Sequence, residues 1–406
     1  MKVTKIEIYE CSILRRHPHL AGKGIGSFCP VIVRVTTDEG ISGIGEVGLA
    51  FGAGAKAASG MLRDLAKYVL GKDPMKIEAI WEAMYRQSFW GMGGGPVVYG
   101  GMSAYDIALW DIKGKKLGVP LYQLLGGKSN QSLRSYASQI QFGWGEKIFL
   151  CSKPEHFVEC SLAAVADGFD AIKVDPLQVD RNGLANFGPN GYRQDRHGLL
   201  RADDIAMGVE RIAAIREAVG PNVDIILELH SLLGTHSATQ FIKACEPYGI
   251  YYCEEPVNPM NPKAMIKVAQ DTNTPIATGE RSYTRWGFRE MLENQALAVV
   301  QPDLCLVGGL TEGKKICDLA NIYDATVQIH VCGSPITTAA ALHLETAIPN
   351  FIIHEEHTYA SKLCMQELCT NDYQPVNGRH VAPELPGLGQ DLNEDVMKDY
   401  LVATIE

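Results

Sequence analysis

Three glutamates recur at one constant interval, and this interval limits the folds that the chain can adopt. Glu228, Glu254 and Glu280 each end a short apolar run that is typical of a buried strand. The interval is long enough for one strand, one helix and their connections, and parallel strands end at the same edge of a sheet. The sequence therefore predicts three carboxylates side by side at the C-terminal ends of neighbouring parallel strands.

The same alternation of strands and helices extends over residues 131–370. Helical patterns such as 204–219, 235–245 and 310–323 separate the apolar runs. Eight repeats favour a closed parallel barrel over a doubly wound sheet, and a barrel carries its active site at the C-terminal ends of its strands. The predicted strands are 134–140, 170–175, 223–229, 249–254, 275–279, 297–301, 325–330 and 350–355.

The remaining chain is too long to be barrel connections alone, because the protein has 406 residues. Residues 1–130 begin with strand-like runs, followed by a glycine-rich loop at 91–96 and a helical pattern at 103–116. We expect an α+β domain here that caps the barrel. The C-terminal segment, residues 371–406, is expected to pack back on that domain.

Composition excludes several classes of protein. The net charge is −10 and Lys and Arg form no cluster, so a nucleic-acid partner is not expected. No apolar run is long enough to predict a membrane span. The 11 cysteines fit neither a disulfide framework nor a zinc-knuckle spacing, so we expect reduced thiols and a cytoplasmic location.

The three glutamates also predict a metal. Unpaired carboxylates packed together would repel one another strongly, and a hard divalent cation removes that repulsion. An all-oxygen ligand set without His or Cys favours Mg²⁺, with Mn²⁺ next. Glu228, Glu254 and Glu280 are therefore the candidate metal ligands.

Two histidines flank this glutamate set. His230 follows Glu228 by two residues, so strand alternation would place both side chains on one side. His330 and Asp303 end neighbouring predicted strands and are expected to pair, with the Asp fixing the imidazole tautomer. For His230 we expect no carboxylate partner beyond the metal ligands.

Other charged residues near the strand ends are candidates for holding an anionic substrate. Lys173 and Asp175 end the second predicted strand, and Arg281 follows the last glutamate. The long run 176–203 is rich in Gly, Asn, Arg and Asp, and we expect it to be a mobile loop that covers the barrel mouth.

This set of residues suits removal of a weakly acidic proton. Taking the proton next to a carboxylate builds negative charge on the carboxylate oxygens, which a metal stabilises more in the transition state than in the ground state. A neutral imidazole can accept that proton near pH 7. A second acid can then protonate a hydroxyl on the next carbon so that water leaves.

The sequence resembles the mandelate racemase subgroup of the enolase superfamily over nearly its whole length. The matching motifs are Asp38-Glu39-Gly40, Gly45-Glu46, Ala108–Lys115, Glu254-Glu255-Pro256, Gly279-Glu280-Arg281, Gln301-Pro302-Asp303, Gly308–Glu312 and Pro386–Gly389. The resemblance implies an α/β fold, a modified (β/α)7β TIM-type barrel with an α+β N-terminal capping domain completed by the C-terminal segment. It also implies association into a homo-oligomer.

Within the subgroup, the motif Glu228-Leu229-His230 resembles that of galactonate and mannonate dehydratases. The resemblance implies that His330 with Asp303 is the base and that His230 is the acid. Glu355 would then hydrogen-bond the substrate carboxylate. Glu228 stands where relatives usually carry Asp.

The expected function is a Mg²⁺-dependent acid-sugar dehydratase that forms a 2-keto-3-deoxy sugar acid. Two alternatives stay open on the sequence. The first is a sugar-acid epimerase that uses Lys173 and His330 on opposite faces of the substrate. The second is a metal-binding relic or sensor with little turnover, because a fold does not guarantee a function.

Overall fold

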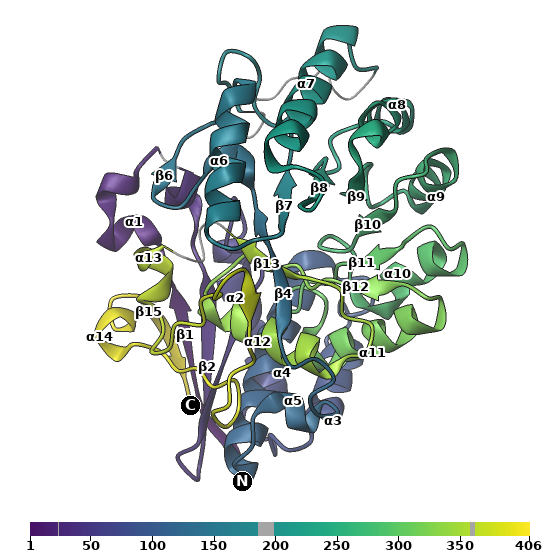
Figure 1. Ribbon diagram of the computed structural model, residues 1–406. Helices are drawn as coiled ribbons and strands as arrows, with labels where there is room; N and C mark the ends of the chain where they lie inside the picture. The colour runs from purple at the N-terminus through teal and green to yellow at the C-terminus, as the bar shows by residue number, and fades with distance from the viewer. Residues whose placement is uncertain (23, 186–198, 358–361) are drawn as a thin grey trace.

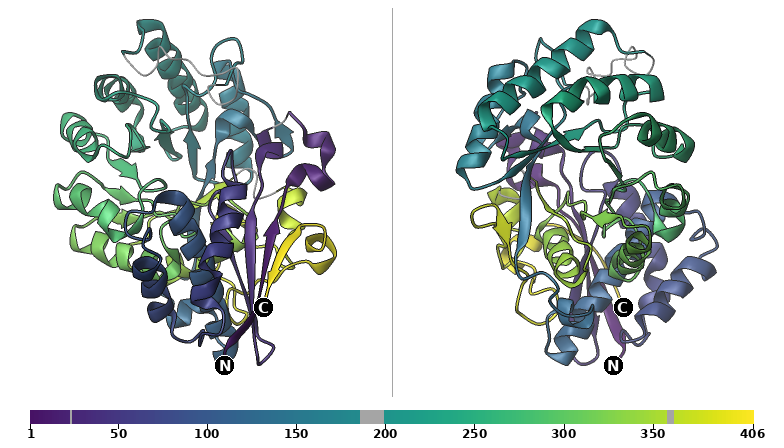
Figure 2. Two further views of the ribbon diagram at one scale, coloured as in Figure 1. Left: turned by 180° about the vertical axis from the view of Figure 1, so that it is seen from behind. Right: turned by 45° about the vertical axis from the view of Figure 1, so that its right-hand side comes forward.

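The computed structural model describes residues 1–22, 24–185, 199–357 and 362–406. It shows a parallel barrel beside a smaller α+β domain, and both chain termini lie at the end of the molecule formed by that domain (Figures 1 and 2). The expected fold class, a modified TIM-type barrel with an N-terminal cap, is confirmed.

Within the described residues the barrel contains eight parallel strands in sequential order, with the last beside the first. They are β4 (Leu133–Ser138), β7 (Ala171–Val174), β8 (Asp224–Glu228), β9 (Ile250–Glu254), β10 (Ile276–Thr278), β11 (Val299–Val300), β12 (Thr326–Val327) and β13 (His354–His357). An isolated parallel bridge from Val327 to Phe351 joins β12 to the chain just before β13 and closes the ring.

A helix follows each of the first seven barrel strands and covers the outside of the barrel. These helices are α6 (Pro154–Ala166), α7 (Ala202–Val219), α8 (Thr235–Cys245), α9 (Pro262–Asp271), α10 (Thr284–Glu293), α11 (Gly309–Ile322) and α12 (Pro335–Ala347). Predicted helix 235–245 matches α8 at both ends, because its apolar face has a clear helical period.

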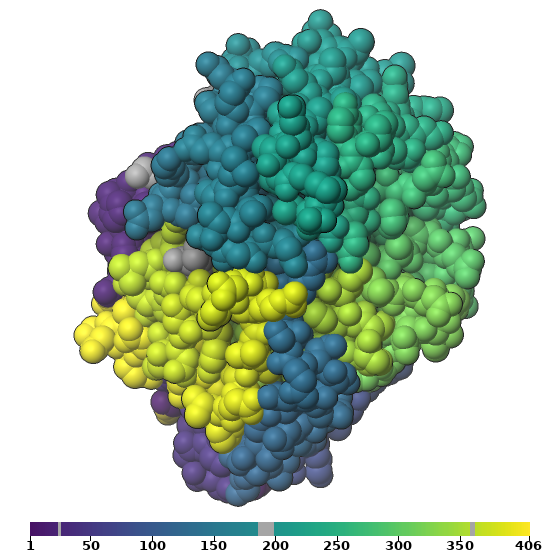
Figure 3. All heavy atoms as spheres, in the orientation of Figure 1, coloured from purple at the N-terminus to yellow at the C-terminus, as the bar shows by residue number. Residues whose placement is uncertain are grey.

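The cap is an antiparallel sheet with helices packed on one face. The sheet order is β15-β1-β2-β3, so the C-terminal strand pairs with the N-terminal strand. The strands are β1 (Val3–Glu10), β2 (Val31–Thr37), β3 (Ser42–Val47) and β15 (Leu401–Ile405), and the helices are α2 (Ala55–Val69), α3 (Ile77–Glu82) and α4 (Gly95–Leu117). In Figure 3 the surface of the C-terminal segment, in yellow, adjoins that of the early chain, in purple and blue.

Close packing of β3 against α4 depends on glycine. A Cβ atom on Gly45 would lie 1.9 Å from the carbonyl oxygen of Ala104, so any side chain there would push the helix off the sheet. The next residue, Glu46, points to the barrel. It accepts hydrogen bonds from the backbone N–H and hydroxyl of Ser334 and from the Thr337 hydroxyl at the start of α12.

Several element boundaries differ from the sequence prediction, among them the start of α4 and the end of β13. The helix expected at 103–116 begins at Gly95, so the end of the glycine-rich run 91–96 forms its first turn. The eighth strand was expected to end at Glu355 but extends to His357, where it pairs with Ser138 of β4. Pairing with a neighbouring strand set this boundary, and local composition could not reveal it.

The run 176–203 is only partly described, because residues 186–198 lie outside the described ranges, so its predicted mobility stays a prediction. In its first part, Leu177 and Val179 are buried. Arg211 of α7 donates to the carbonyl oxygens of Pro176 and Val179. In the described ranges, no helix has both the length and the apolar character needed to cross a bilayer.

Candidate active site

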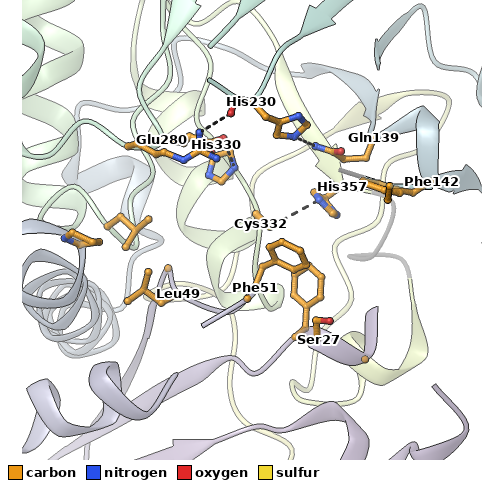
Figure 4. A pocket seen from close by; sticks show the side chains of 18 of the residues that line it. Ser27, Leu49, Phe51, Gln139, Phe142, His230, Glu280, His330, Cys332 and His357 are labelled. Carbon is orange, nitrogen blue, oxygen red and sulfur yellow. Dashed lines mark hydrogen bonds and ion pairs between the residues drawn. The ribbon is translucent and has the colours of Figure 1, made fainter. Parts of the chain in front are cut away.

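A cavity of about 980 Å³ lies between the cap and the C-terminal ends of the barrel strands (Figure 4). The cap contributes mainly apolar side chains, among them Leu14, Phe28, Leu49 and Phe51. The barrel contributes ionisable ones, among them His230, Glu280, Arg281, His330 and His357. The volume suits a small organic ligand that is charged on one side only.

His330 and Asp303 lie at the ends of neighbouring strands and are hydrogen-bonded as expected. Nδ1 of His330 is 2.7 Å from Oδ2 of Asp303, and its Nε2 is 3.2 Å from Oε2 of Glu280. Burial alone would lower the pKa of His330, but the Glu280 charge and the Asp303 hydrogen bond raise it to about 10. Burial would raise the pKa of Glu280, but His330 and Arg281 bring it down to about 2.

His230 has a carboxylate partner that the sequence did not reveal. Its Nδ1 lies 2.7 Å from Oδ2 of Asp175, which follows β7 on the neighbouring strand. The expectation that His230 has no orienting carboxylate beyond the metal ligands is therefore wrong. Asp175 is 1% exposed and was expected to bind substrate, but in the structure it holds this imidazole.

The backbone around His230 also departs from the expected strand alternation. Strand β8 ends at Glu228, and both His230 and Ser231 adopt left-handed backbone angles, with φ of 45° and 59°. The His230 N–H donates to Oε1 of Glu228 at 2.6 Å, so the two residues lie together through a tight turn. Left-handed conformations are costly for non-glycine residues and cluster at functional sites.

Lys173 lies inside the barrel among the carboxylates. Its Nζ is 2.6 Å from Oε1 of Glu254 and 2.9 Å from Oε1 of Glu355. Oε2 of Glu228 lies 3.4 Å from the same nitrogen. Burial opposes the charged form, but these three carboxylates raise the Lys173 pKa well above its usual value. Lys173 is 1% exposed and is not among the described residues that line the cavity.

The three predicted metal ligands come from consecutive strands but do not all meet at one point. Glu228 and Glu254 are paired in register across β8 and β9. Glu280 instead contacts Arg281, whose Nη2 is 3.1 Å away, and His330. Within the described ranges their oxygens do not form a group at mutual metal-ligand distance.

The donor set nevertheless fits a divalent cation. Oε2 of Glu228 is buried and, among the described residues, accepts no hydrogen bond. Burial raises the pKa of Glu228 to about 7 and that of Glu254 well above its usual value. Buried carboxylates with raised pKa values are stabilised by added positive charge, and an all-oxygen set suits Mg²⁺.

Glu355 and Arg281, the two remaining residues predicted to bind the substrate, both contact other groups of the protein. Glu355 accepts from the Ser138 hydroxyl at 2.8 Å and from the Val331 N–H at 2.9 Å. Arg281 forms ion pairs with Glu255 and Glu280, and it lines the cavity. Only Arg281 of this pair is therefore open to a ligand in the described cavity.

Sequence reasoning missed two residues that line the cavity beside the histidines. His357 lies two residues after Glu355 on β13, and strand alternation from Glu355 would have identified it. Nε2 of Gln139 lies 3.5 Å from Nε2 of His230 (Figure 4). Gln139 has a left-handed backbone with φ of 64°, and no pattern in the sequence marks it.

Comparison with known proteins identifies the family. Residues 5–126 match the mandelate racemase / muconate lactonizing enzyme N-terminal domain, and residues 157–396 match the enolase C-terminal domain-like family. The chain belongs to this family of two-domain enzymes, within the enolase superfamily.

Individual relatives agree with this placement. The chain is 34% identical to a D-xylonate dehydratase of Haloferax volcanii over 93% of its own length and 86% of the relative's. It is also 34% identical to a D-galactonate dehydratase of Ralstonia nicotianae, over 90% and 89% of the two lengths. A solved enolase-superfamily structure from Salmonella Typhimurium has a TM-score of 0.94 and 51% identity, with 100% of both chains covered. The protein is therefore an enzyme of the hydro-lyase class, a dehydratase.

Proposed function

We propose that the protein uses Mg²⁺ to dehydrate a sugar acid of the galactonate or mannonate type and yields a 2-keto-3-deoxy sugar acid. The observation that carries the proposal is a pair of imidazole–carboxylate couples at one cavity. His330 is coupled to Asp303 and His230 to Asp175, and each Nδ1–Oδ2 distance is 2.7 Å. The names of the relatives support the sugar-acid class.

The first step is removal of the proton on the carbon next to the carboxylate. His330 takes this proton through Nε2, because Asp303 engages Nδ1 and fixes the ring. A base must be unprotonated, and the Glu280 charge is the main influence that keeps His330 protonated. Any cation that offsets Glu280 therefore frees the imidazole for its role.

The second step is loss of the hydroxyl on the next carbon. His230 donates the Nε2 proton to that oxygen, and the C–O bond breaks with release of water. Asp175 stabilises the charged imidazole before the transfer. The electron pair from the broken C–H bond forms the C=C bond of an enol, which becomes the 2-keto acid by proton transfer.

The glutamates on β8 and β9 and the one after β10 would hold the metal. When bound, Mg²⁺ stabilises the negative charge that grows on the substrate carboxylate. Arg281 lines the same cavity and can contribute a second positive charge toward that carboxylate. The apolar cap residues Phe28, Leu49 and Phe51 exclude water from the reacting carbons, which strengthens these interactions.

The epimerase alternative is less well supported. It needs Lys173 as a base on one face of the substrate, and Lys173 is 1% exposed and bound to three carboxylates. The second imidazole, His230, has its own carboxylate partner, as expected for an acid that protonates a leaving hydroxyl.

A substrate screen tests the proposal. The protein is incubated with a library of aldonic and aldaric acids in Mg²⁺ and in EDTA, and 2-keto acid formation is measured by semicarbazide absorbance. We expect turnover of a small set of hexonates or pentonates in Mg²⁺ only. Recovery of an epimer without 2-keto acid, or equal turnover in EDTA, would contradict it.

A further inference from the structure

A second group of metal-type side chains lies outside the barrel wall, away from the catalytic cavity. His354 and Glu356 are on the face of β13 opposite to Glu355, and His380 is on β14 (Arg379–His380), which pairs antiparallel with β4. Within the described ranges this is the group of three whose ligand atoms all lie within 4.8 Å of one another. The relative exposure of the three residues is 0%, 4% and 2%.

Both imidazoles are held through Nδ1, which leaves Nε2 directed to the group. Nδ1 of His354 is 2.7 Å from Oε2 of Glu345, and Nδ1 of His380 is 2.8 Å from the Ser135 hydroxyl. The Ser135 hydroxyl can donate to the Leu133 carbonyl oxygen at 3.3 Å and accept from Nδ1 of His380, and in that tautomer Nε2 of His380 carries a lone pair. A carboxylate that holds one ring nitrogen while the other binds metal is a recurrent arrangement in metal sites.

Among the described residues, three atoms that face one another in this group have no hydrogen bond. Nε2 of His354, Nε2 of His380 and Oε1 of Glu356 are buried and, among the described residues, have no hydrogen bond. Nε2 of His380 lies 3.3 Å from Oε2 of Glu356. A nitrogen lone pair this close to a carboxylate oxygen is unfavourable unless a cation or a proton lies between them.

Both histidines and Glu356 are buried, so a cation bound among them would be shielded from solvent. Imidazole nitrogen is a common metal ligand in proteins.

We propose that His354, Glu356 and His380 form a Zn²⁺ site, distinct from the catalytic glutamates. Two imidazole nitrogens and one carboxylate oxygen are a zinc ligand set with one open position, and nitrogen donors disfavour Mg²⁺.

The site links three parts of the chain that are far apart in sequence. His354 is directly paired with Ser135 across β13 and β4, and His380 reaches the same Ser135 from β14. A metal here would fasten the C-terminal segment to the seam where the barrel closes. Its expected effect is on stability, since Glu355, and not Glu356, faces Lys173 inside the barrel.

Cobalt binding tests the site with a readout independent of catalysis. Metal-free full-length protein is titrated with CoCl₂ in excess MgCl₂, and visible absorption reports tetrahedral Co²⁺. We expect one equivalent bound, displacement by one equivalent of Zn²⁺, and a higher melting temperature with Zn²⁺.

Variants separate this site from the catalytic one. His354→Gln and His380→Gln should weaken Co²⁺ binding by more than about 100-fold, beyond the roughly 10–100-fold that follows loss of an orienting partner. Glu345→Gln removes only an orienting partner of His354 and should weaken Co²⁺ binding within that smaller range. His343 is a buried histidine elsewhere on α12, and His343→Gln should leave Co²⁺ binding unchanged. Glu280→Gln should keep the Co²⁺ signal.

The opposite results would overturn the proposal. Wild-type protein that binds no Co²⁺ or Zn²⁺ in excess Mg²⁺ would show that a proton alone satisfies the group. A signal that Glu280→Gln abolishes would assign the metal to the catalytic glutamates. Both outcomes are read from metal binding and not from dehydratase activity. The test of this site therefore stays valid even if the proposed function is wrong.

Discussion

Asp175 and His230 form a hydrogen-bonded couple, with Oδ2 of the first 2.7 Å from Nδ1 of the second. The couple repeats the geometry of Asp303 and His330 on another pair of strand ends. Both rings are held through Nδ1 and both line the same cavity. Two oriented imidazoles allow one to act as base and the other as acid, which is what elimination of water requires.

The Asp175 carboxylate should matter for expulsion of the hydroxyl. We expect Asp175→Asn to lower the dehydration rate by about 10²–10⁴-fold, because the amide cannot stabilise the charged His230 ring. The Asp175→Asn variant should still exchange with solvent the substrate proton that His330 removes. The measurement pairs kcat for 2-keto acid formation with hydrogen exchange followed by NMR.

The surface variant Asp271→Asn, on α9, is the control and should leave both rates unchanged. If Asp175→Asn loses exchange and dehydration together, His230 has no separate role as acid.

Lys173 should stabilise the fold most when metal is absent. Lys173→Met leaves Glu254 and Glu355 without their cation, and loss of one partner of a buried ion pair costs about 3–5 kcal/mol. Mg²⁺ should recover part of this loss by supplying positive charge to Glu254, which is also a proposed metal ligand. Urea unfolding in EDTA and in Mg²⁺ measures both effects, with the exposed Lys147→Met as control. An equal loss in the two buffers would argue against a metal at these glutamates.

Glu280 should be needed for Mg²⁺ binding. Replacing its carboxylate with an amide in Glu280→Gln removes a charge from the proposed ligand set, and Mg²⁺ affinity measured by calorimetry should fall at least about 10-fold. Glu293→Gln, an exposed residue of α10 paired with Arg289, serves as the comparison. Unchanged Mg²⁺ affinity in Glu280→Gln would remove it from the ligand set.

Glu46, which joins the cap to the barrel, should make stability depend on pH. Burial raises its pKa from 4.5 to about 7, offset in part by Ser334 and Thr337. The folded state therefore holds a proton that the unfolded state has lost, and this contribution to stability falls as pH rises from about 4.5 to 7. Relative to Glu46→Gln, the wild-type free energy of unfolding should fall by up to about 3 kcal/mol over that range. Parallel curves for the two proteins would contradict the assignment.

The sequence was most informative where chemistry follows a repeating element. The glutamates end consecutive strands, and the pairing of His330 with Asp303 follows from adjacent strand ends, so both could be predicted from the interval between repeats. The sequence predicted that Asp175 lies at a strand end, but it did not predict that Asp175 pairs with His230. His230 lies beyond its strand in a left-handed turn, and strand alternation no longer applies there.

The buried cluster around Lys173 shows a second limit of the sequence. An ammonium group at a strand end can point to a substrate or to neighbouring carboxylates, and only packing decides between the two. In the structure its nitrogen lies within 3.4 Å of three carboxylates on separate strands. Likewise His380 reaches Ser135 through a short C-terminal strand that composition alone does not reveal.

The central claim is the division of labour between His330 as base and His230 as acid. The most direct test is NMR of a sugar-acid substrate recovered from D₂O after incubation with His330→Asn or His230→Asn in Mg²⁺. We predict that His230→Asn exchanges the hydrogen next to the carboxylate without forming product, while His330→Asn does neither. Exchange by His330→Asn together with its loss in His230→Asn would reverse the two roles and contradict this account.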